Sequence, residues 1–352
     1  MVCILELKET ILELCALPSP SGFEGAVRSR VRELLAPYAD EIRTDAMGNL
    51  IAVKRCGKTD AKKLLLDAHM DEIGLIVTGH EDGFLRFGTI GGVDQRMLPA
   101  REVKILTDPP IFGVIDTLPP HILSEDEMDK SIDADKLFID AGLTQQEAQE
   151  RVPLGTPAVY AGGVTELTEN VLCGKSLDDR SCVAIILKTM EALANTELGV
   201  DLYCLISTQE ELGTRGATVG AFSIAPDYAF ALDVTFASTP DTKKGQTMEL
   251  RKGAAIGVGP NMHRALTQRL IALAKEREIP YQLEIMGGNT GTDGWPIQVS
   301  RDGVATLLVS LPIRCMHTPV ETMDLSDAEG IVKLLTAFIP TLGADEGGKA
   351  NA

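Results

Sequence analysis

Five short motifs, which together hold two histidines and several aspartates and glutamates, are spread over this 352-residue chain, and most of them directly follow a short apolar run. Such runs are typical of buried strands. In open α/β sheets, ligands bind beyond the carboxyl ends of the strands. The sequence therefore predicts an α/β fold whose sheet brings these motifs together at one edge. The motifs are residues 68–72, 177–180, 209–211, 232–235 and 316–319.

The length of the chain and a change in its sequence pattern predict two domains. A chain of 352 residues exceeds the size at which a single core usually stops growing. Residues 1–72 and 164–352 alternate helix-like and strand-like patterns, which predicts a central mixed sheet flanked by helices. Residues 73–163 contain short β-rich runs separated by glycine, proline and aspartate. This segment is expected to form a small β-rich domain inserted into the larger one.

Individual elements follow from hydrophobic periodicity and turn residues. Ser21 and Glu24 fit a capping box at the start of a helix. The expected helices cover residues 1–17, 144–151, 181–194, 265–278 and 324–338. The expected strands include residues 49–53, 64–68, 202–207, 228–234 and 305–310. Residues 124–130 are expected to form a solvated loop and residues 343–352 a disordered tail.

Charge and cysteine usage exclude several classes of protein. The net charge of −18 argues against nucleic acid and anionic membrane surfaces as partners, since both select for basic patches. The seven cysteines are odd in number and show no C-x-x-C spacing, which favours reduced thiols over disulfides or sulfur ligands. No apolar run is long enough to cross a bilayer, and the charged N-terminus does not fit a signal peptide. We expect a cytoplasmic protein.

The donor groups of the motifs predict a site for paired divalent metals. Two imidazoles with three or four carboxylates form such a donor set, and zinc, cobalt and manganese are all suitable ions. Asp71 lies two residues after His69, where its carboxylate can fix the orientation of a metal-bound imidazole. The pair Asp178 and Asp179 allows two interpretations: they cap the following helix, or one of them bridges two cations.

Glu210 and Glu211 are the sharpest local signal. Adjacent carboxylates at the end of an apolar strand repel each other unless a cation is near, although a surface pair is the simpler interpretation. In a metal-assisted hydrolase one of the two binds the metal and the other acts as general base.

Together these motifs resemble those of the TET or glutamyl aminopeptidase family of dinuclear metallo-aminopeptidases, whose members sometimes carry an endoglucanase label. The resemblance runs from residues 19–22, through the five motifs, to residue 321. It also includes residues 287–295, which match a loop near the substrate pocket of the family.

The resemblance implies a role for each motif residue. Asp178 would bridge two metals, and Asp179 would shape the peptide geometry beside it. Glu210 would be the general base and proton shuttle, and Asp71 would orient His69. The remaining ligands would be His69 and Asp233 for one metal, and Glu211 and His317 for the other. The inserted segment resembles the dimerisation domain of the family, in which many members assemble dimers into a dodecamer.

The expected function is removal of N-terminal residues from peptides that have a free N-terminus. A metal-dependent deacylase of small N-acyl compounds shares the chemistry and stays an alternative. A glycosidase fits less well, because it needs two carboxyl groups facing each other at roughly 5–9.5 Å, which adjacent glutamates do not supply. An assembly protein with structural metals is the non-enzymatic alternative, although every expected ligand and the expected base are present.

Overall fold

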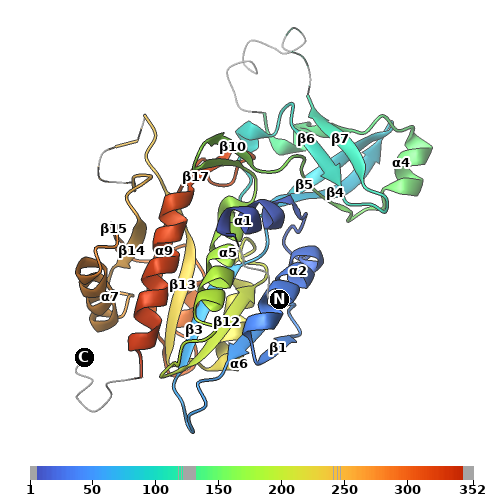
Figure 1. The fold of residues 1–352 in the computed structure, drawn as a ribbon. Helices are drawn as coiled ribbons and strands as arrows, with labels where there is room; N and C mark the ends of the chain where they lie inside the picture. Colours follow the sequence, from blue (N-terminus) through green and yellow to red (C-terminus); the bar gives the residue numbers. More distant parts are fainter. Residues whose placement is uncertain are drawn as a thin grey trace.

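The chain folds into a large mixed sheet covered by helices and a separate small barrel (Figure 1). The structure, a computed structural model, describes residues 6–343 apart from residues 118, 120, 122–131, 241, 244 and 246. The architecture confirms the predicted fold class of a helix-flanked mixed sheet with a small β-rich domain. The loop expected at 124–130 and the tail beyond residue 343 lie outside the described residues.

Four parallel strands form the centre of the large sheet. Its strand order is β1-β2-β12-β3-β13-β16-β17-β11-β10, and β14 attaches to β16 and carries β15. Strands β12, β3, β13 and β16 run parallel to their neighbours in this series, so their carboxyl ends lie at one edge. The strands are β1 (Glu41–Thr44), β2 (Leu50–Lys54), β3 (Lys63–His69), β10 (Thr165–Thr168), β11 (Val171–Gly174), β12 (Asp201–Ser207), β13 (Tyr228–Phe236), β14 (Ala254–Val258), β15 (Tyr281–Ile285), β16 (Ala305–Arg314) and β17 (Glu321–Asp324).

Helices cover both faces of this sheet because its central strands are apolar on both sides. In β3, Leu64 and Leu66 face the larger core, whereas Leu65 faces the opposite, smaller core. Helices α1 (Leu7–Ala16), α2 (Gly25–Leu35), α5 (Leu177–Ala192) and α9 (Leu325–Phe338) pack on the first face, which is in front in Figure 1. Helices α6 (Arg215–Ile224) and α8 (Gly294–Gln298) cover the second face.

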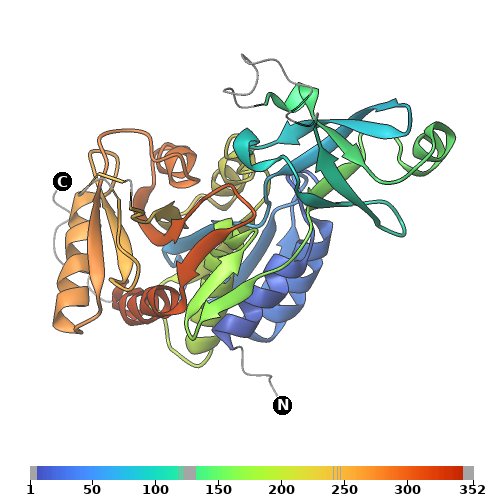
Figure 2. The ribbon, with the colours of Figure 1, turned by 90° about the horizontal axis from the view of Figure 1, so that it is seen from above.

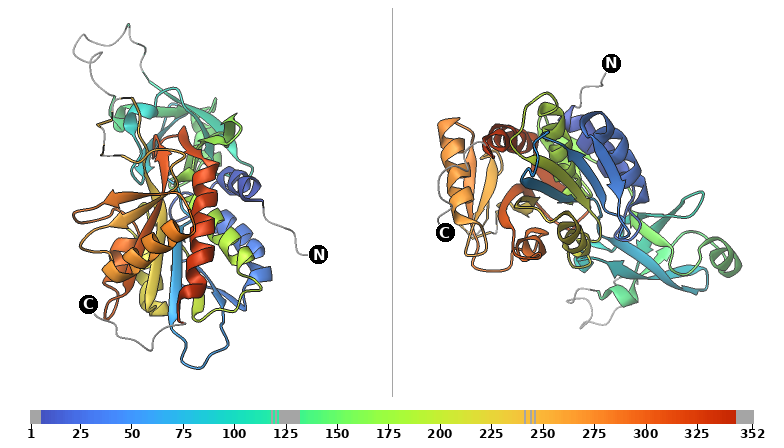
Figure 3. Two further views of the ribbon diagram at one scale, coloured as in Figure 1. Left: turned by 60° about the vertical axis from the view of Figure 1, so that its left-hand side comes forward. Right: turned by 90° about the horizontal axis from the view of Figure 1, so that it is seen from below.

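Helix α5 is the most buried helix of the first face. Its side chains from Leu177 to Leu187 are all buried, and it packs against α1 and α9. Figure 3 shows α9, in red, beside α5, in green. Helix α7 (Arg264–Glu276) packs against β14 at the far end of the sheet.

The small domain is a closed barrel with a core of its own. Its strands follow the order β4-β5-β8-β7-β6-β9 around the barrel, and apolar side chains such as Leu75, Leu85 and Ile139 fill its interior. Figure 2 places the barrel at one end of the molecule and α7 at the other. The barrel elements are β4 (Gly74–Glu81), β5 (Phe84–Ile90), β6 (Glu102–Ile105), β7 (Ile111–Asp116), β8 (Phe138–Asp140), β9 (Pro157–Tyr160) and α4 (Gln145–Arg151).

Most of the expected elements are confirmed, but the capping box at Ser21 and Glu24 is wrong. Helix α2 begins at Gly25, and no side chain caps its first turn. The carboxylate of Glu24 instead accepts a hydrogen bond from the backbone of Gly22, and the Ser21 hydroxyl donates to Asp71. A true capping box occurs in the barrel, where Thr144 and Glu147 cap α4.

The described cysteines are free thiols, as the sequence predicts. Four 3-10 turns complete the described secondary structure, at Ala36–Tyr38, Gln95–Met97, Ala134–Lys136 and Ile339–Thr341. Within the described part of the chain, no helix has the length and apolar character needed to cross a membrane.

Gly216 of α6 packs closely against the loop that follows β12. The Asn49 side chain donates to the carbonyl of Gly216 and accepts from the backbone of Thr208. A methyl group at Gly216 would lie 2.3 Å from the Thr208 carbonyl oxygen and 2.4 Å from the Asn49 side-chain oxygen, so it cannot fit without moving this loop.

We therefore expect Gly216→Ala to lower the free energy of unfolding by about 1–3 kcal/mol, the usual cost of overpacking. Urea-induced unfolding followed by circular dichroism measures the change. Gly330→Ala in α9 is the matched control, because a methyl group there meets no atom within 4 Å. It should stabilise the helix by up to about 1 kcal/mol. Equal effects of the two variants would contradict this packing.

Candidate metal centre

The expected ligand segments meet at one edge of the large sheet. His69 is the last residue of β3, and Asp233 lies near the end of the adjacent strand β13. Glu210 and Glu211 follow β12 on the other side of β3, and His317 follows β16. The parallel order of these four strands places their carboxyl ends together, as the sequence predicts.

Asp178 is the centre of the cluster, because its two carboxylate oxygens contact different histidines. Its Oδ1 atom lies 3.0 Å from Nε2 of His69, and its Oδ2 atom lies 3.3 Å from Nε2 of His317. Nε2 of His317 is also 3.4 Å from Oε2 of Glu211. The donor atoms form two groups, each compact enough to hold a metal ion. The first group is His69, Asp178 and Asp233, and the second is Asp178, Glu211 and His317.

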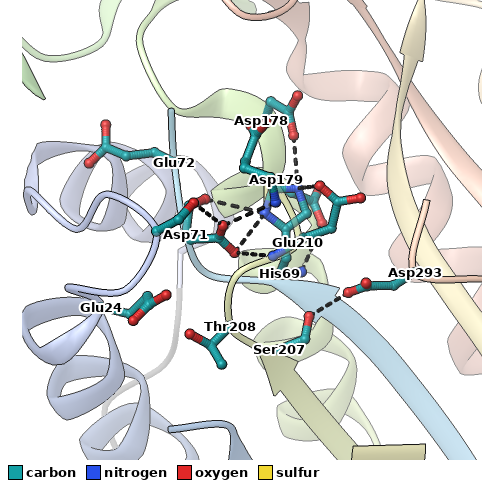
Figure 4. A network of polar contacts seen from close by, with 12 residues as sticks. Glu24, His69, Asp71, Glu72, Asp178, Asp179, Ser207, Thr208, Glu210 and Asp293 are labelled. Carbon is teal, nitrogen blue, oxygen red and sulfur yellow. Dashed lines mark hydrogen bonds and ion pairs between the residues drawn. The ribbon is translucent and has the colours of Figure 1, made fainter. Parts of the chain in front are cut away.

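Glu210 and Asp71 lie on either side of His69. Oε2 of Glu210 is 4.0 Å from Nε2 of His69. Nδ1 of His69 lies 3.5 Å from Oδ1 of Asp71 and 3.2 Å from the Asp71 carbonyl oxygen. Figure 4 shows His69, Asp71 and Glu210 pointing toward one another, with Asp178 and Asp179 beside them. Every site residue predicted from the sequence therefore belongs to one cluster.

The two aspartates at the start of α5 do not act as a helix cap. Both residues have non-helical backbone angles, so the regular turns of α5 begin after Asp179. Among the described contacts, neither side chain accepts a backbone hydrogen bond from that first turn, and the Asp178 carboxylate contacts the two histidines instead. The Asp179 side chain accepts a hydrogen bond of 3.3 Å from the backbone of His69. The peptide between Asp178 and Asp179 is cis. The arrangement favours the second interpretation of the pair, in which Asp178 faces both donor groups.

Burial and mutual repulsion shift the pKa values of the cluster carboxylates. Burial raises the pKa of Glu210 to about 10; His69 opposes this shift, and Asp233 reinforces it. Burial and the charge of Asp178 raise the pKa of Glu211 to about 7. Burial also raises the pKa of Asp233 well above its ordinary value. These carboxyl groups lack enough positive charge around them.

His69 and His317 are the nearby groups whose positive charge partly balances these carboxylates. Burial alone would lower the pKa of His317, but hydrogen bonding to Asp178 raises it to about 10. The same balance raises the pKa of His69 and, despite burial, lowers that of Asp178. Among the described residues, no lysine or arginine forms a salt bridge with the cluster carboxylates. The donor set thus fits cations, since a divalent ion would supply the missing charge.

Asp71 also fixes the loop that carries the two glutamates. Its Oδ1 atom accepts a hydrogen bond of 3.0 Å from the backbone of Glu210, and its Oδ2 atom accepts one of 3.2 Å from the backbone of Glu211. The hydroxyl of Ser21 donates to the same Oδ2 atom at 2.5 Å. Asp71 therefore positions both the histidine and the adjacent glutamates.

Glu321 has a matching role that the sequence did not reveal. Its Oε2 atom accepts a hydrogen bond of 3.2 Å from the backbone of Asp178, and its Oε1 atom accepts one of 3.0 Å from the backbone of His317. A single buried carboxylate thus links two ligand segments that lie far apart in the chain. Its sequence signals were its position four residues after His317 and its place at the end of the family resemblance.

Two further sets of buried polar contacts join the segments that carry the cluster residues. Glu72 pairs with Lys175 at 2.7 Å and lies 3.5 Å from the fully buried Arg180. Arg180 also donates to the carbonyl of Leu14 at the end of α1. On the other face, Asp293 accepts a hydrogen bond of 2.6 Å from Ser207. These contacts depend on long-range packing, which has no local sequence signal.

A cavity of about 360 Å³ opens beside the cluster. It reaches from the cluster side chains to Thr290, Gly291 and Thr292 of the loop expected near the substrate pocket. Part of this loop therefore lies beside the cluster. Glu210 faces the same cavity, so a bound molecule would lie next to its carboxylate.

Comparison with known proteins identifies the family. Residues 48–334 match the M42 glutamyl aminopeptidase family. The chain belongs to this family. The lysyl aminopeptidase of Pyrococcus furiosus is 38% identical over 343 residues, which cover 96% of this chain and 97% of that protein. The M42 membership makes this chain a metal-dependent aminopeptidase, which confirms the function expected from its motifs.

Solved structures of TET aminopeptidases share the fold. The TET aminopeptidase from the marine sediment archaeon Thaumarchaeota archaeon SCGC AB-539-E09 has a TM-score of 0.91 and 31% identity, covering 96% of this chain and 97% of that one. The TET1 peptidase of Pyrococcus horikoshii has a TM-score of 0.85 and 32% identity, covering 96% and 100%. The M42 fold therefore extends over almost the whole chain.

We expect Glu321→Gln to weaken the binding of divalent metal by about 10–100-fold, a usual effect of losing a group that orients ligands. An amide retains one acceptor oxygen but places an NH₂ group against the second backbone N–H. Titration of the metal-free protein with Zn²⁺ or Co²⁺ in a calorimeter measures the change. Glu329→Gln, an exposed position on α9, is the control and should bind metal normally. Equal affinity in both variants would rule out this role for Glu321.

Proposed function

We propose that this M42 aminopeptidase uses two divalent ions per chain, with Asp178 shared between them. The observation that carries the proposal is the geometry of Asp178, whose two oxygens face His69 and His317 separately. His69 and Asp233 would complete one site, and Glu211 and His317 the other. Nitrogen and carboxylate donors suit zinc or cobalt, and manganese is also compatible with them.

The positions of Glu210 and Asp71 support their proposed roles in the reaction. A divalent cation in this cluster would supply Lewis acidity, which polarises the scissile carbonyl and makes water more acidic. Glu210 lines the cavity beside the cluster, where it can take a proton from the attacking water and return it to the leaving amine. The Asp71 carboxylate accepts a hydrogen bond from the backbone N–H of Glu210, which keeps Glu210 in place, and it also orients His69.

The charge of the site favours peptides with a free N-terminus as substrates. Glu210 faces the cavity and is not a proposed metal ligand, so its carboxylate would attract the positively charged amine of such a peptide. An acylated amine carries no charge and would lose this attraction, which separates the proposed activity from that of a deacylase. One relative is named a lysyl aminopeptidase and another, from Lactococcus lactis, a glutamyl aminopeptidase, so their names do not settle the preferred residue.

The domain roles and the assembly form a second part of the proposal. Residues 1–72 and 164–352 would form the catalytic domain, and residues 73–163 a dimerisation domain built on the barrel. We propose that dimers assemble into a dodecamer in the cytoplasm. The Pyrococcus horikoshii TET1 peptidase, described as able to assemble into a tetrahedron or a large octahedral shell, supports a large homo-oligomer.

The Glu210→Gln variant tests the role of the general base. The amide preserves the shape of the side chain but cannot accept a proton, so turnover should fall by about 10²–10⁴-fold while the metal content stays unchanged. Hydrolysis of a panel of aminoacyl-p-nitroanilides measures turnover, and mass spectrometry of the metals measures their content.

The N-acetylated counterparts of the same substrates provide the control for substrate class. The metal-loaded wild-type protein should cleave only the compounds with a free amine, and a chelator should abolish this activity. Cleavage of the acetylated compounds would favour a deacylase. Full activity of Glu210→Gln would show that another group acts as the base.

A further inference from the structure

The cavity beside the metal cluster contains a carboxylate that the proposed mechanism does not use. Glu284 lies on β15, far in sequence from every cluster residue, and its side chain lines the same cavity as Asp233 and His317. Among the described residues that line this cavity, none is a lysine or an arginine. Glu284 therefore has no lysine or arginine partner among the residues that line the cavity.

Two hydroxyl groups hold the Glu284 carboxylate in place. Thr235 donates a hydrogen bond to one of its oxygens, and Ser310 donates to the other at 3.0 Å. Both donors are buried, which fixes their positions. Each carboxylate oxygen has a second lone pair, so the carboxylate can still accept hydrogen bonds from a ligand.

The register of the sheet places Glu284 at a defined step from the metal cluster. Asp233 and Thr235 lie two residues apart on β13, so their side chains share one face and their Cα atoms are about 7 Å apart. Ser310 of β16 pairs directly with Asp233. The Glu284 carboxylate, bound to Thr235 and Ser310, thus lies about one side-chain length beyond the cluster.

The remaining wall of the cavity is largely apolar. Met286 and Met316 contribute flexible thioether side chains, and Phe236 contributes an aromatic ring that is 62% exposed. An aliphatic chain can pack against such a surface. The pocket thus combines an apolar middle with an anionic end, which matches an aliphatic side chain that ends in a cation.

We propose that this pocket binds the side chain of a basic N-terminal residue, lysine or arginine, with its cationic end paired with Glu284. The inference rests on the proposed function, because it requires the peptide N-terminus to lie at the metal cluster. The aliphatic stem of the substrate packs on the methionines while its ammonium or guanidinium group donates to the carboxylate. An acidic N-terminal side chain is repelled by the same carboxylate.

Burial raises the pKa of Glu284, and the two hydroxyl groups partly offset this shift. A ligand cation lowers the pKa again, because it stabilises the charged carboxylate. The pair is formed in a partly buried pocket, where an ionic hydrogen bond is stronger than at the open surface.

The test compares kcat/KM for the p-nitroanilides of lysine, arginine, methionine and glutamate with metal-loaded protein. Methionine has a similar length to lysine but no charge. The wild-type protein should prefer lysine and arginine over methionine, and glutamate should be the poorest substrate. Glu284→Gln should lower kcat/KM for lysine and arginine by roughly 10–100-fold, the usual value of one charged hydrogen bond, and change it for methionine by less than about twofold.

The Glu276→Gln variant is the matched control. Glu276 is an exposed residue on α7, and its substitution removes the same charge from the surface outside the cavity. It should retain the preference for basic residues, which would show that the net charge of the chain does not cause it.

The outcomes separate this inference from the proposed function. Two results would overturn the basic pocket and leave the aminopeptidase activity in place. One is a higher kcat/KM of the wild-type protein for methionine than for lysine, and the other is an equal fall in kcat/KM for all substrates in Glu284→Gln. Absence of cleavage of every free-amine substrate overturns both. A selective loss of the basic substrates, with the methionine activity retained as the check on folding, supports the pocket.

Discussion

The mutual repulsion of carboxylates at the carboxyl edge of the sheet is the constraint on which the rest of this structure depends. Asp178, Glu210, Glu211 and Asp233 converge there, and among the described residues two imidazoles balance them. Buried like charges at these distances are unfavourable unless cations neutralise them. The site is therefore built for divalent ions, and the surrounding fold must hold the segments together.

The fold meets this requirement with carboxylates that accept backbone hydrogen bonds. Asp71 binds the backbone of the two glutamates, and Glu321 binds the backbone of Asp178 and His317. Each of these residues links two segments that are distant in the chain. Such links keep metal ligands oriented in the absence of any direct contact with the metal. They also explain why the ligand segments can occupy turns and still have a defined geometry.

The sequence predicted the site more completely than it predicted the supporting contacts. His69, Glu210, Glu211 and Asp233 lie at the ends of apolar strands, and parallel strands bring their carboxyl ends together. The family resemblance then assigned each ligand, and the structure brings all of them into one cluster. Hydrophobic periodicity likewise identified the central strands and the long helices.

The contacts that were missed share one physical cause. Ser21 fits a local capping pattern, yet its hydroxyl donates to Asp71, 50 residues away. Glu284 and Glu321 have ordinary local sequences, and their partners come from distant strands. The short helix α6 was also missed, because its small residues give a weak pattern, and Gly216 is required there by close packing against Thr208. Local patterns contain no information on such partners.

The number of divalent ions bound per chain shows whether Asp178 is shared between two metals. We would load the metal-free protein with Zn²⁺ or Co²⁺, remove free metal and count the bound ions by mass spectrometry. We expect two ions in the wild-type protein and loss of both in Asp178→Ala, with the thermal unfolding of each protein as the check on folding. A folded Asp178→Ala variant that still binds two ions would contradict the shared role of Asp178.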